Sequence, residues 1–147
     1  MKKTILLFLT IFFYFESILA DVKIKPLLEG NVEAKISLIV YESLTCGHCA
    51  KFHTETYPKL KKDFIDTGFV KIEFRSFPLD LASFNASKIA HCKNDGKSDI
   101  LHYLFKNQKK WAKGKTIEEI NSNLLRFFES GKYDIDIFKC ISNKEVE

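Results

Sequence analysis

The sequence predicts an α/β fold in which a strand–helix–strand unit carries a cysteine pair and a helical subdomain follows. An apolar, β-branched run at 34–43 comes directly before the pair, and an alternating run at 69–77 comes about one helix later. Beyond Pro78, apolar residues recur only at helical spacing. Two strands joined by one helix predict parallel pairing with a right-handed crossover.

The first twenty residues predict a secretory signal. A basic "MKK" is followed by the apolar run "TILLFLTIFFYF" and by "ESILA", which favours cleavage after Ala20. The alternative is a permanent membrane anchor formed by residues 4–15, but this run is shorter than the ~20 residues that span a bilayer. We therefore expect a periplasmic or otherwise exported protein without stable membrane insertion after cleavage.

Cleavage would leave residues 21–147, enough for one domain. The signal removes two of the 23 basic residues and one of the 19 acidic ones, which leaves 21 against 18 and a net charge of +3. This weak excess, on scattered lysines, does not favour a nucleic-acid partner. We expect the strand–helix–strand part at 21–81 and the helical subdomain at 82–147.

The first half of the chain has three predicted elements. The run at 34–43 thickens into continuous apolar residues, which indicates a strand buried on both faces of the sheet. A helix should begin at the cysteine pair, with a distortion at Pro58 because proline lacks a backbone donor, and Gly68 should stop it. The alternation at 69–77 indicates the second strand. The cysteine pair then lies at the carboxyl end of the first strand, where open α/β folds place their chemistry.

The second half predicts four helices. The first spans 82–92, and the second is marked by apolar residues between 100 and 111. Thr116 followed by Glu119 forms a capping box that opens the third. Either Asp134 or Asp136 could cap the fourth. We interpret their apolar stripes as core.

Cys46 and Cys49 are the candidate catalytic residues. Cys46 should lie at a helix N-terminus, where unpaired N–H groups and the helix dipole stabilise a reactive thiolate. Cys49, one turn later, should be less exposed and resolve the mixed disulfide that Cys46 forms. Gly47 and His48 should tune the pair, because a protonated or hydrogen-bonding His48 favours the Cys46 thiolate and makes the disulfide form a stronger oxidant.

Two other interpretations of the pair are less favoured. Zinc could bind Cys46, Cys49, a histidine and a fourth ligand, but structural zinc sites usually bring two ligand pairs and the chain has one Cys-x-x-Cys. A structural Cys46–Cys49 disulfide would close too short a loop to restrain the unfolded chain. We expect no metal and no organic cofactor. His53 lies one turn beyond Cys49 on a partly apolar face and is interpreted as a packed or partly exposed helix residue rather than a metal ligand. His91 and His102 have no partner visible in the sequence and are interpreted as ordinary residues.

Four cysteines are an even set, and export would allow disulfides to form and persist among them. Besides Cys46 and Cys49 the chain contains Cys92 and Cys140. Four cysteines permit three pairings, and the residues alone do not choose among these.

Several segments in order resemble the DsbA-like thiol–disulfide oxidoreductases, exported thioredoxin-fold proteins with an inserted helical domain. They are "VYESLTCGHCAKFH", "YPKLKKDFIDTGFVKIEFRSFPLD", "KIAHC" and "DIFKC", and the resemblance covers 28–145. It implies that Cys46 is the nucleophile and Cys49 the resolving thiol, with His48 in the dipeptide that sets the redox potential. Members often carry Pro-His where this chain has Gly-His, the pair found in protein disulfide isomerases, which implies an isomerase-like or milder oxidant poise.

The resemblance also implies partners and a second disulfide. The substrates would be exported cysteine-containing proteins, and a membrane or periplasmic protein would serve as redox partner. Cys92 and Cys140 resemble the pair that bridges the helical insert in some relatives.

One departure from the family pattern affects the fold. The family continues after the helical insert with a cis-proline loop, a strand hairpin and a closing helix, whereas the prolines here are Pro26, Pro58 and Pro78 and the sequence ends at Glu147. We therefore expect the C-terminal half of the thioredoxin fold to be missing, leaving a two-strand sheet with an uncovered edge. Two alternative functions stay open: a metal-binding carrier using Cys46, Cys49 and a histidine, and an inactive truncated remnant.

Overall fold

A three-stranded mixed sheet forms the centre of the structure, a computed structural model that describes residues 24–129 and 133–143. The predicted signal at 1–20 lies outside the described residues. The strands stand in the order β1-β3-β2, and their bounds are β1 Leu27–Glu29, β2 Ile36–Glu42 and β3 Val70–Ser76. β2 runs parallel to β3 and β1 runs antiparallel to it. The parallel strand pair predicted from 34–43 and 69–77 is therefore confirmed.

The expectation of a two-strand sheet is wrong, because β1 pairs with the free side of β3. Leu27 lies opposite Phe74 and Glu29 opposite Ile72. A three-residue strand is too short to show a two-residue alternation, so no periodicity could predict it.

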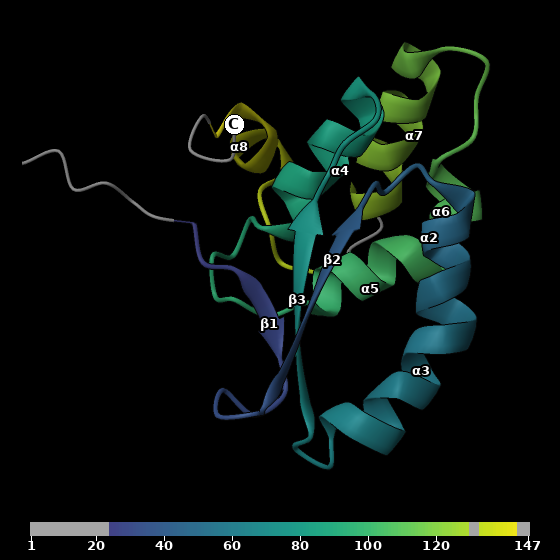
Figure 1. The fold of residues 1–147 in the computed structure, drawn as a ribbon. Helices are drawn as coiled ribbons and strands as arrows, with labels where there is room; N and C mark the ends of the chain where they lie inside the picture. The colour runs from purple at the N-terminus through teal and green to yellow at the C-terminus, as the bar shows by residue number, and fades with distance from the viewer. Residues whose placement is uncertain (1–23, 130–132, 144–147) are drawn as a thin grey trace, which may run out of the picture.

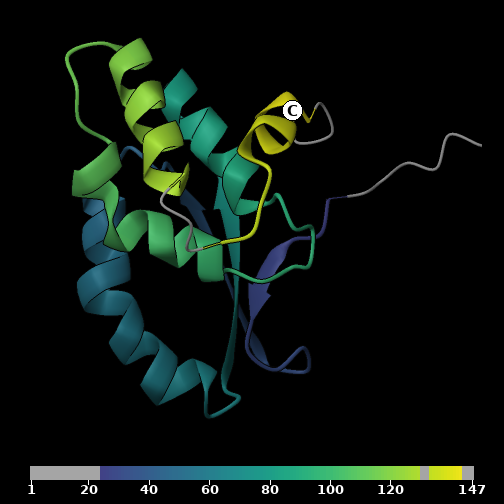
Figure 2. The same cartoon turned by 180° about the vertical axis from the view of Figure 1, so that it is seen from behind.

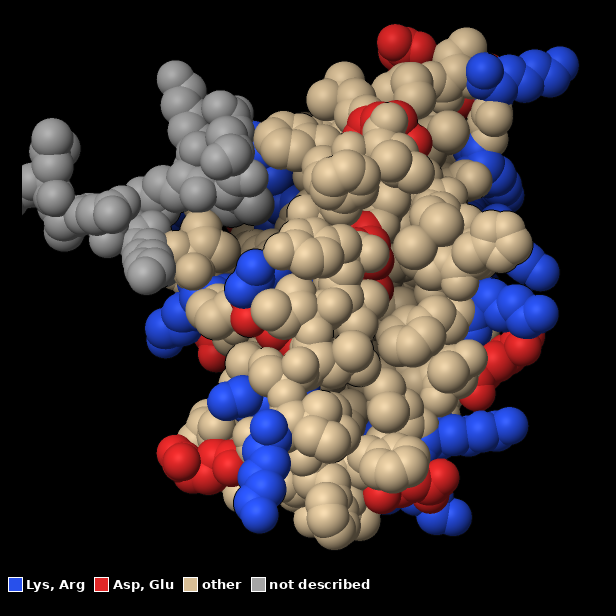
Figure 3. All heavy atoms as spheres, in the orientation of Figure 1, with Lys and Arg blue, Asp and Glu red and all other residues tan. Residues whose placement is uncertain are grey.

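The expectation that β2 is buried on both faces is also wrong. Within the described residues β2 is an edge strand, and its Ile36 and Tyr41 side chains are 57% and 60% exposed. Helices cover one side of the sheet (Figure 2), whereas uncharged side chains occupy most of the middle of the opposite side (Figure 3). The continuous apolar run in β2 therefore belongs to a strand whose second face and outer edge are not covered by other described residues.

One long, curved helical segment joins β2 to β3 (Figure 1). It contains two π-helical turns, one just before Pro58 and one after it, as expected where a proline removes a backbone hydrogen bond. Gly68 follows its end with a φ of +81°, a conformation that suits glycine. The four parts are α2 Gly47–Lys51, η2 Phe52–Thr56, α3 Tyr57–Leu60 and η3 Lys61–Ile65.

The second half is helical, as predicted, but the predicted second helix is divided at Asn107. Thr116 Oγ1 accepts the Glu119 N–H at 3.3 Å near the start of the third, and Asp136 rather than Asp134 caps the last. Among the described helices, none is long and apolar enough to cross a membrane. The bounds are α4 Leu81–Ala90, α5 Asp99–Lys106, α6 Gln108–Trp111, α7 Ile117–Glu129 and α8 Ile137–Ser142.

The two halves share one hydrophobic core. The helical part begins at Leu81, next to the predicted boundary at 81/82, yet buried side chains from both parts pack in a single cluster. Trp111 is fully buried, and its indole N–H donates to the Leu104 carbonyl at 2.9 Å. The largest buried side chains of this core are Trp111, Phe105, Leu44, Ile72, Ile89, Ile100, Leu104 and Leu124.

A disulfide joins Cys92, in the turn after α4, to Cys140 in α8, with 5.1 Å between the two Cα atoms. Lys88 of α4 reinforces this contact by donating from Nζ to the Ile141 carbonyl at 3.1 Å. The short α8 is thus fastened to the helical part covalently and by a hydrogen bond.

We predict that the double substitution Cys92→Ser/Cys140→Ser lowers the free energy of unfolding by about 4 kcal/mol. The disulfide closes a loop with a sequence separation of 48, and its removal returns that conformational entropy to the unfolded chain. Denaturant unfolding without reductant measures the change. Cys46→Ser/Cys49→Ser is the control, because these cysteines are three positions apart and close no long loop. Equal stability of the two double variants would contradict the prediction.

Candidate active site

The turn between β2 and α2 places Cys46 at the N-cap position of the helix. The Cys46 backbone is extended (φ −75°, ψ 119°), and its Sγ accepts the backbone N–H of Cys49 at 3.4 Å. Its carbonyl oxygen accepts the Ala50 N–H at 3.1 Å and so starts the helical hydrogen bonds. The predicted location of Cys46, at a strand end and a helix start, agrees with the structure.

Side chains from the helical part hold this turn. The Leu44 N–H donates to Ser83 Oγ of α4 at 2.8 Å. Gln108 of α6 donates from Nε2 to the carbonyl oxygens of Leu44 at 2.8 Å and Cys46 at 2.9 Å. Sequence reasoning missed Ser83 and Gln108, because these contacts cross 39 and 64 positions and leave no local pattern.

The two thiols differ in acidity. The pKa of Cys46 is lowered, first by a hydrogen bond from the Cys49 thiol, then by the backbone N–H groups of Cys49 and His48. Burial raises the pKa of Cys49 to about 11, and the negative charges of Cys46 and Glu42 add to this effect. Of the two thiols, Cys46 therefore loses its proton at the lower pH, while Cys49 keeps its proton at neutral pH.

Gly47 and His48 are both exposed between the cysteines. The effect of His48 on Cys46 comes from its backbone N–H, whereas sequence reasoning invoked its imidazole. A Cβ atom built on Gly47 would meet no other atom within 4 Å, so packing does not require glycine at this position. The redox-tuning roles of Gly47 and His48 stay predictions.

A chain of hydrogen-bonded side chains runs through the core next to the cysteine pair. Glu42 Oε2 lies 2.6 Å from His53 Nε2, His53 Nδ1 lies 2.9 Å from His102 Nδ1, and His102 Nε2 lies 2.7 Å from Glu29 Oε1. The interpretation of His102 as a residue without a partner is therefore wrong, whereas His53 is a packed helix residue, as expected. His91 lies outside the chain, with its Nδ1 atom buried and without a hydrogen-bond partner among the described residues.

The chain has a defined arrangement of protons. Burial raises the pKa of Glu42 to about 8, and burial together with the nearby His102 lowers the pKa of His53 to about 3. A protonated Glu42 donates to His53 Nε2, so a neutral His53 carries its proton on Nδ1 and donates to His102. Hydrogen bonds from His102, Ser98 and Tyr57 outweigh burial and lower the pKa of Glu29, which accepts from His102 Nε2 as a carboxylate.

This arrangement does not gather the ligands that a metal carrier would need. Both ring nitrogens of His53 are engaged, with Glu42 and His102, so neither is free to join Cys46 and Cys49 as a metal ligand. Within residues 24–129 and 133–143 no three histidine, cysteine or acidic side chains are grouped as a metal site requires.

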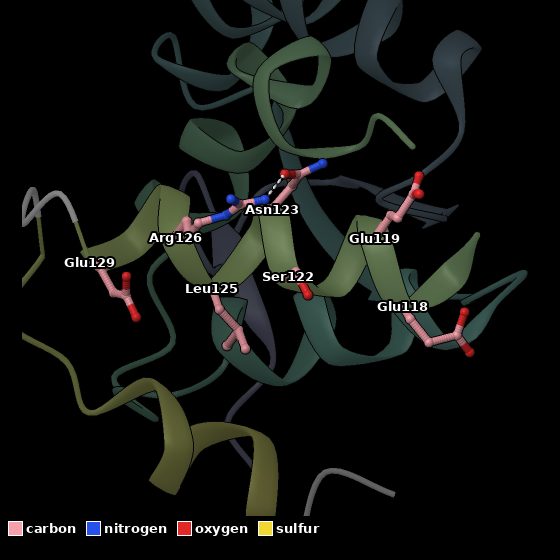
Figure 4. A pocket seen from close by; sticks show the side chains of 7 residues that line it. All are labelled: Glu118, Glu119, Ser122, Asn123, Leu125, Arg126 and Glu129. Carbon is pink, nitrogen blue, oxygen red and sulfur yellow. Dashed lines mark hydrogen bonds between the residues drawn. The ribbon is translucent and has the colours of Figure 1, made fainter. Parts of the chain in front are cut away.

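Two surface hollows differ in their relation to the cysteine pair. A hollow of about 520 Å³ adjoins the pair; Gly47 and Ala50 line it together with Lys51, with Lys106 of α5 and with the two lysines of α6. A hollow of about 780 Å³ lies along α7 and is lined by seven residues without a cysteine or a histidine (Figure 4). Only the first is placed to contact a molecule that reacts with Cys46.

Fold and site together define a class of protein: a thioredoxin-like domain with an inserted helical part and a Cys-x-x-Cys pair at its strand–helix junction. The family described as "Thioredoxin" matches residues 23–147, and the chain belongs to it.

Similar proteins place it among DsbA-like members. It is 31% identical over 119 residues to a Rickettsia bellii protein named "Putative protein-disulfide oxidoreductase", covering 80% of this chain and 45% of that one. The crystal structure of Wolbachia pipientis alpha-DsbA1 superposes with a TM-score of 0.71 at 31% identity, covering 82% of this chain and 61% of that one. BdbD from Bacillus subtilis shares the fold, with a TM-score of 0.63 at 23% identity over 80% of this chain and 64% of that one. The chain thus spans less than half of the Rickettsia relative and under two thirds of the Wolbachia protein.

We predict that Glu42→Gln becomes more stable relative to the wild type by roughly 1 kcal/mol for each pH unit between about pH 5 and pH 8. The folded wild type keeps the Glu42 proton up to about pH 8, whereas the unfolded chain loses it near the ordinary pKa of 4.5. The folded state therefore binds more protons in this window, and its stability falls as the pH rises. The amide of the variant still donates to His53 and does not ionise.

Denaturant unfolding across this pH window measures the difference. Glu33→Gln, which removes an exposed carboxylate, is the matched control. Parallel stability profiles for Glu42→Gln and the wild type would contradict a raised pKa at Glu42.

Proposed function

We propose that the protein is an exported thiol–disulfide oxidoreductase that exchanges a disulfide between Cys46–Cys49 and the cysteines of other exported proteins. The observation that carries the proposal is the difference between the two thiols. Cys46 has a lowered pKa at a helix N-terminus, and Cys49 has a pKa raised to about 11 behind it. Thiol–disulfide exchange requires one thiolate that attacks and a second thiol that resolves the mixed disulfide.

The exchange has two steps. In the oxidised form, a client thiolate attacks Cys46 Sγ, the Cys46–Cys49 bond breaks, and Cys49 leaves as a thiolate that must gain a proton. A second client thiolate then attacks the client sulfur of the mixed disulfide, and Cys46 leaves as the stabilised thiolate. The client gains a disulfide and the pair gains two electrons; the reverse sequence reduces or rearranges a client disulfide.

The proposed location and partners have two supports. Residues 1–20 have the layout of a secretory signal, and the Cys92–Cys140 disulfide is typical of proteins in oxidising compartments. The clients would be exported proteins with cysteines, and a membrane or periplasmic redox partner would return the pair to its starting state. The printed name of the Rickettsia relative is consistent with such an activity.

The Gly-His dipeptide between the cysteines is proposed to set the redox poise. Backbone N–H groups at the helix start stabilise the Cys46 thiolate, and a stabilised reduced form makes the disulfide form more oxidising. A side chain is accommodated at Gly47, so the identity of this dipeptide is free to vary with the required potential.

We predict that Cys46→Ser abolishes both insulin reduction and peptide oxidation by the 147-residue chain, whereas Cys49→Ser accumulates a mixed disulfide with the client. Without Cys46 no thiolate is available for attack, and without Cys49 the mixed disulfide is not resolved. Non-reducing electrophoresis and mass spectrometry detect the trapped species. Cys46→Ser/Cys49→Ser is the control and should trap nothing.

The same preparation separates the alternative functions. Stoichiometric metal bound through Cys46 and Cys49, without exchange activity, would favour the metal-binding carrier. A folded wild-type chain with neither metal nor exchange activity would identify an inactive remnant.

A further inference from the structure

The hydrogen-bonded chain of side chains runs from a buried end, here called the dry end, to a partly exposed end, called the wet end. Glu42 and His53 form the dry end, and His102 and Glu29 form the wet end. The side chains of Glu42 and His53 are 2% and 1% exposed. Those of His102 and Glu29 are 25% and 17% exposed. Because each ring nitrogen and one carboxylate oxygen at each end have a partner within 2.9 Å, the chain is continuous from the core to the surface.

The wet end opens into a hollow of about 440 Å³ beside β1 and the loop that precedes α5. Glu29, Ser98 and His102 line it, with Lys93 and Asp95 among the charged residues of its wall. In Figure 1 β1 and the start of α2 lie on opposite sides of β3, so this hollow does not share the surface around Cys46. A client bound at Cys46 would leave the hollow open to water.

The dry end lies next to Cys49. His53 follows Cys49 by four positions on the same helical segment, so the two side chains lie on one face of it, and Glu42 is bonded to His53. Glu42 Oε1 is buried and has no hydrogen-bond partner among the described residues. The charge of Glu42 also raises the pKa of the Cys49 thiol, as expected for neighbouring groups.

We propose that Glu42, His53, His102 and Glu29 form a proton relay between the Cys49 thiol and water in the hollow beside β1. The proposal rests on the exchange function proposed above, because that reaction removes or returns one proton at Cys49 for each disulfide exchanged. Imidazoles suit this role since one ring nitrogen accepts a proton while the other donates one.

The relay moves one proton through a sequence of balanced transfers. When the Cys46–Cys49 disulfide forms, the Cys49 proton passes to Glu42 Oε1 and the proton on Glu42 Oε2 passes to His53 Nε2. The Nδ1 proton of His53 passes to His102 Nδ1, and the Nε2 proton of His102 passes to Glu29 Oε1. Glu29 releases that proton to water and returns to the carboxylate. When the disulfide is reduced, the transfers run in reverse and restore the original tautomers.

Other groups around the relay hold its wet end. Tyr57 donates to Glu29 Oε2, and Lys61 Nζ lies 3.3 Å from the same oxygen. Burial and Glu29 raise the pKa of Tyr57, so this hydroxyl keeps its proton as a donor. The remaining titratable groups that face the relay are Cys46 and Cys49 at the dry end, and Asp66 behind Lys61.

The positions of the imidazole protons on His53 and His102 can be measured without any exchange activity, and they test the relay directly. In the wild-type dithiol form at neutral pH, nitrogen-detected NMR should show His53 protonated on Nδ1 alone and His102 protonated on Nε2 alone, and in the disulfide form the protons should lie on His53 Nε2 and His102 Nδ1. Reduction of the Cys46–Cys49 pair should shift the His102 signals, and His53→Gln should remove that shift. A doubly protonated His53, or His102 signals that ignore the redox state of the pair, would overturn the relay.

Kinetic measurements test whether the relay carries protons during thiol–disulfide exchange. The oxidation of the reduced chain by oxidised glutathione should slow about tenfold in both His102→Gln and Glu29→Gln. The amide of glutamine can form hydrogen bonds at these positions, but it does not accept and release a proton. The solvent deuterium isotope effect should rise, while alkylation of Cys46 keeps its wild-type rate. His91→Gln, a histidine outside the relay, is the control.

The outcomes separate the two proposals. Wild-type oxidation rates in both folded variants overturn the relay and leave the exchange function standing. A wild-type chain that does not react with glutathione refutes the exchange function, and the NMR measurement then still decides whether the proton chain exists.

Discussion

The position of Cys46 depends on hydrogen bonds from the helical part that hold the turn between β2 and α2. Ser83 and Gln108 bond the backbone of Leu44 and Cys46, so the helical part fixes the point at which the strand ends and the helix begins. That point decides which N–H groups reach the Cys46 sulfur. The acidity of the thiol is therefore a property of the contact between the two halves of the protein, although both cysteines belong to the first half.

The parts of this structure that follow from local patterns could be predicted from the sequence. β2, β3 and the Cys-x-x-Cys at their helix were visible because apolar periodicity and a short motif need no distant partner. β1 was not visible, because three residues show no periodicity. His53 and His102 looked ordinary because their partners, Glu42 and Glu29, are brought to them by strand pairing and by α5.

Burying Glu42 and His53 costs free energy that an apolar pair of similar volume would not cost. The cost is limited by the complementary protonation of the two groups, which lets them meet as an uncharged pair rather than as two ions. Polar groups kept in a core at such a cost are typical of functional sites, where folding and function make different demands on the same residues. In this protein the cost is concentrated beside the resolving thiol.

The Cys92–Cys140 disulfide has a consequence for a molecule that carries a reactive thiolate. Cys140 is 2% exposed, and the bridge lies between α4 and α8 instead of beside α2. A nucleophile must approach a disulfide along the line of its two sulfurs, and the burial of Cys140 hinders that approach at its sulfur. Exchange between this bridge and a reactive thiolate, of the same molecule or of a second one, is thereby disfavoured at Cys140, while the Cys46–Cys49 pair stays accessible.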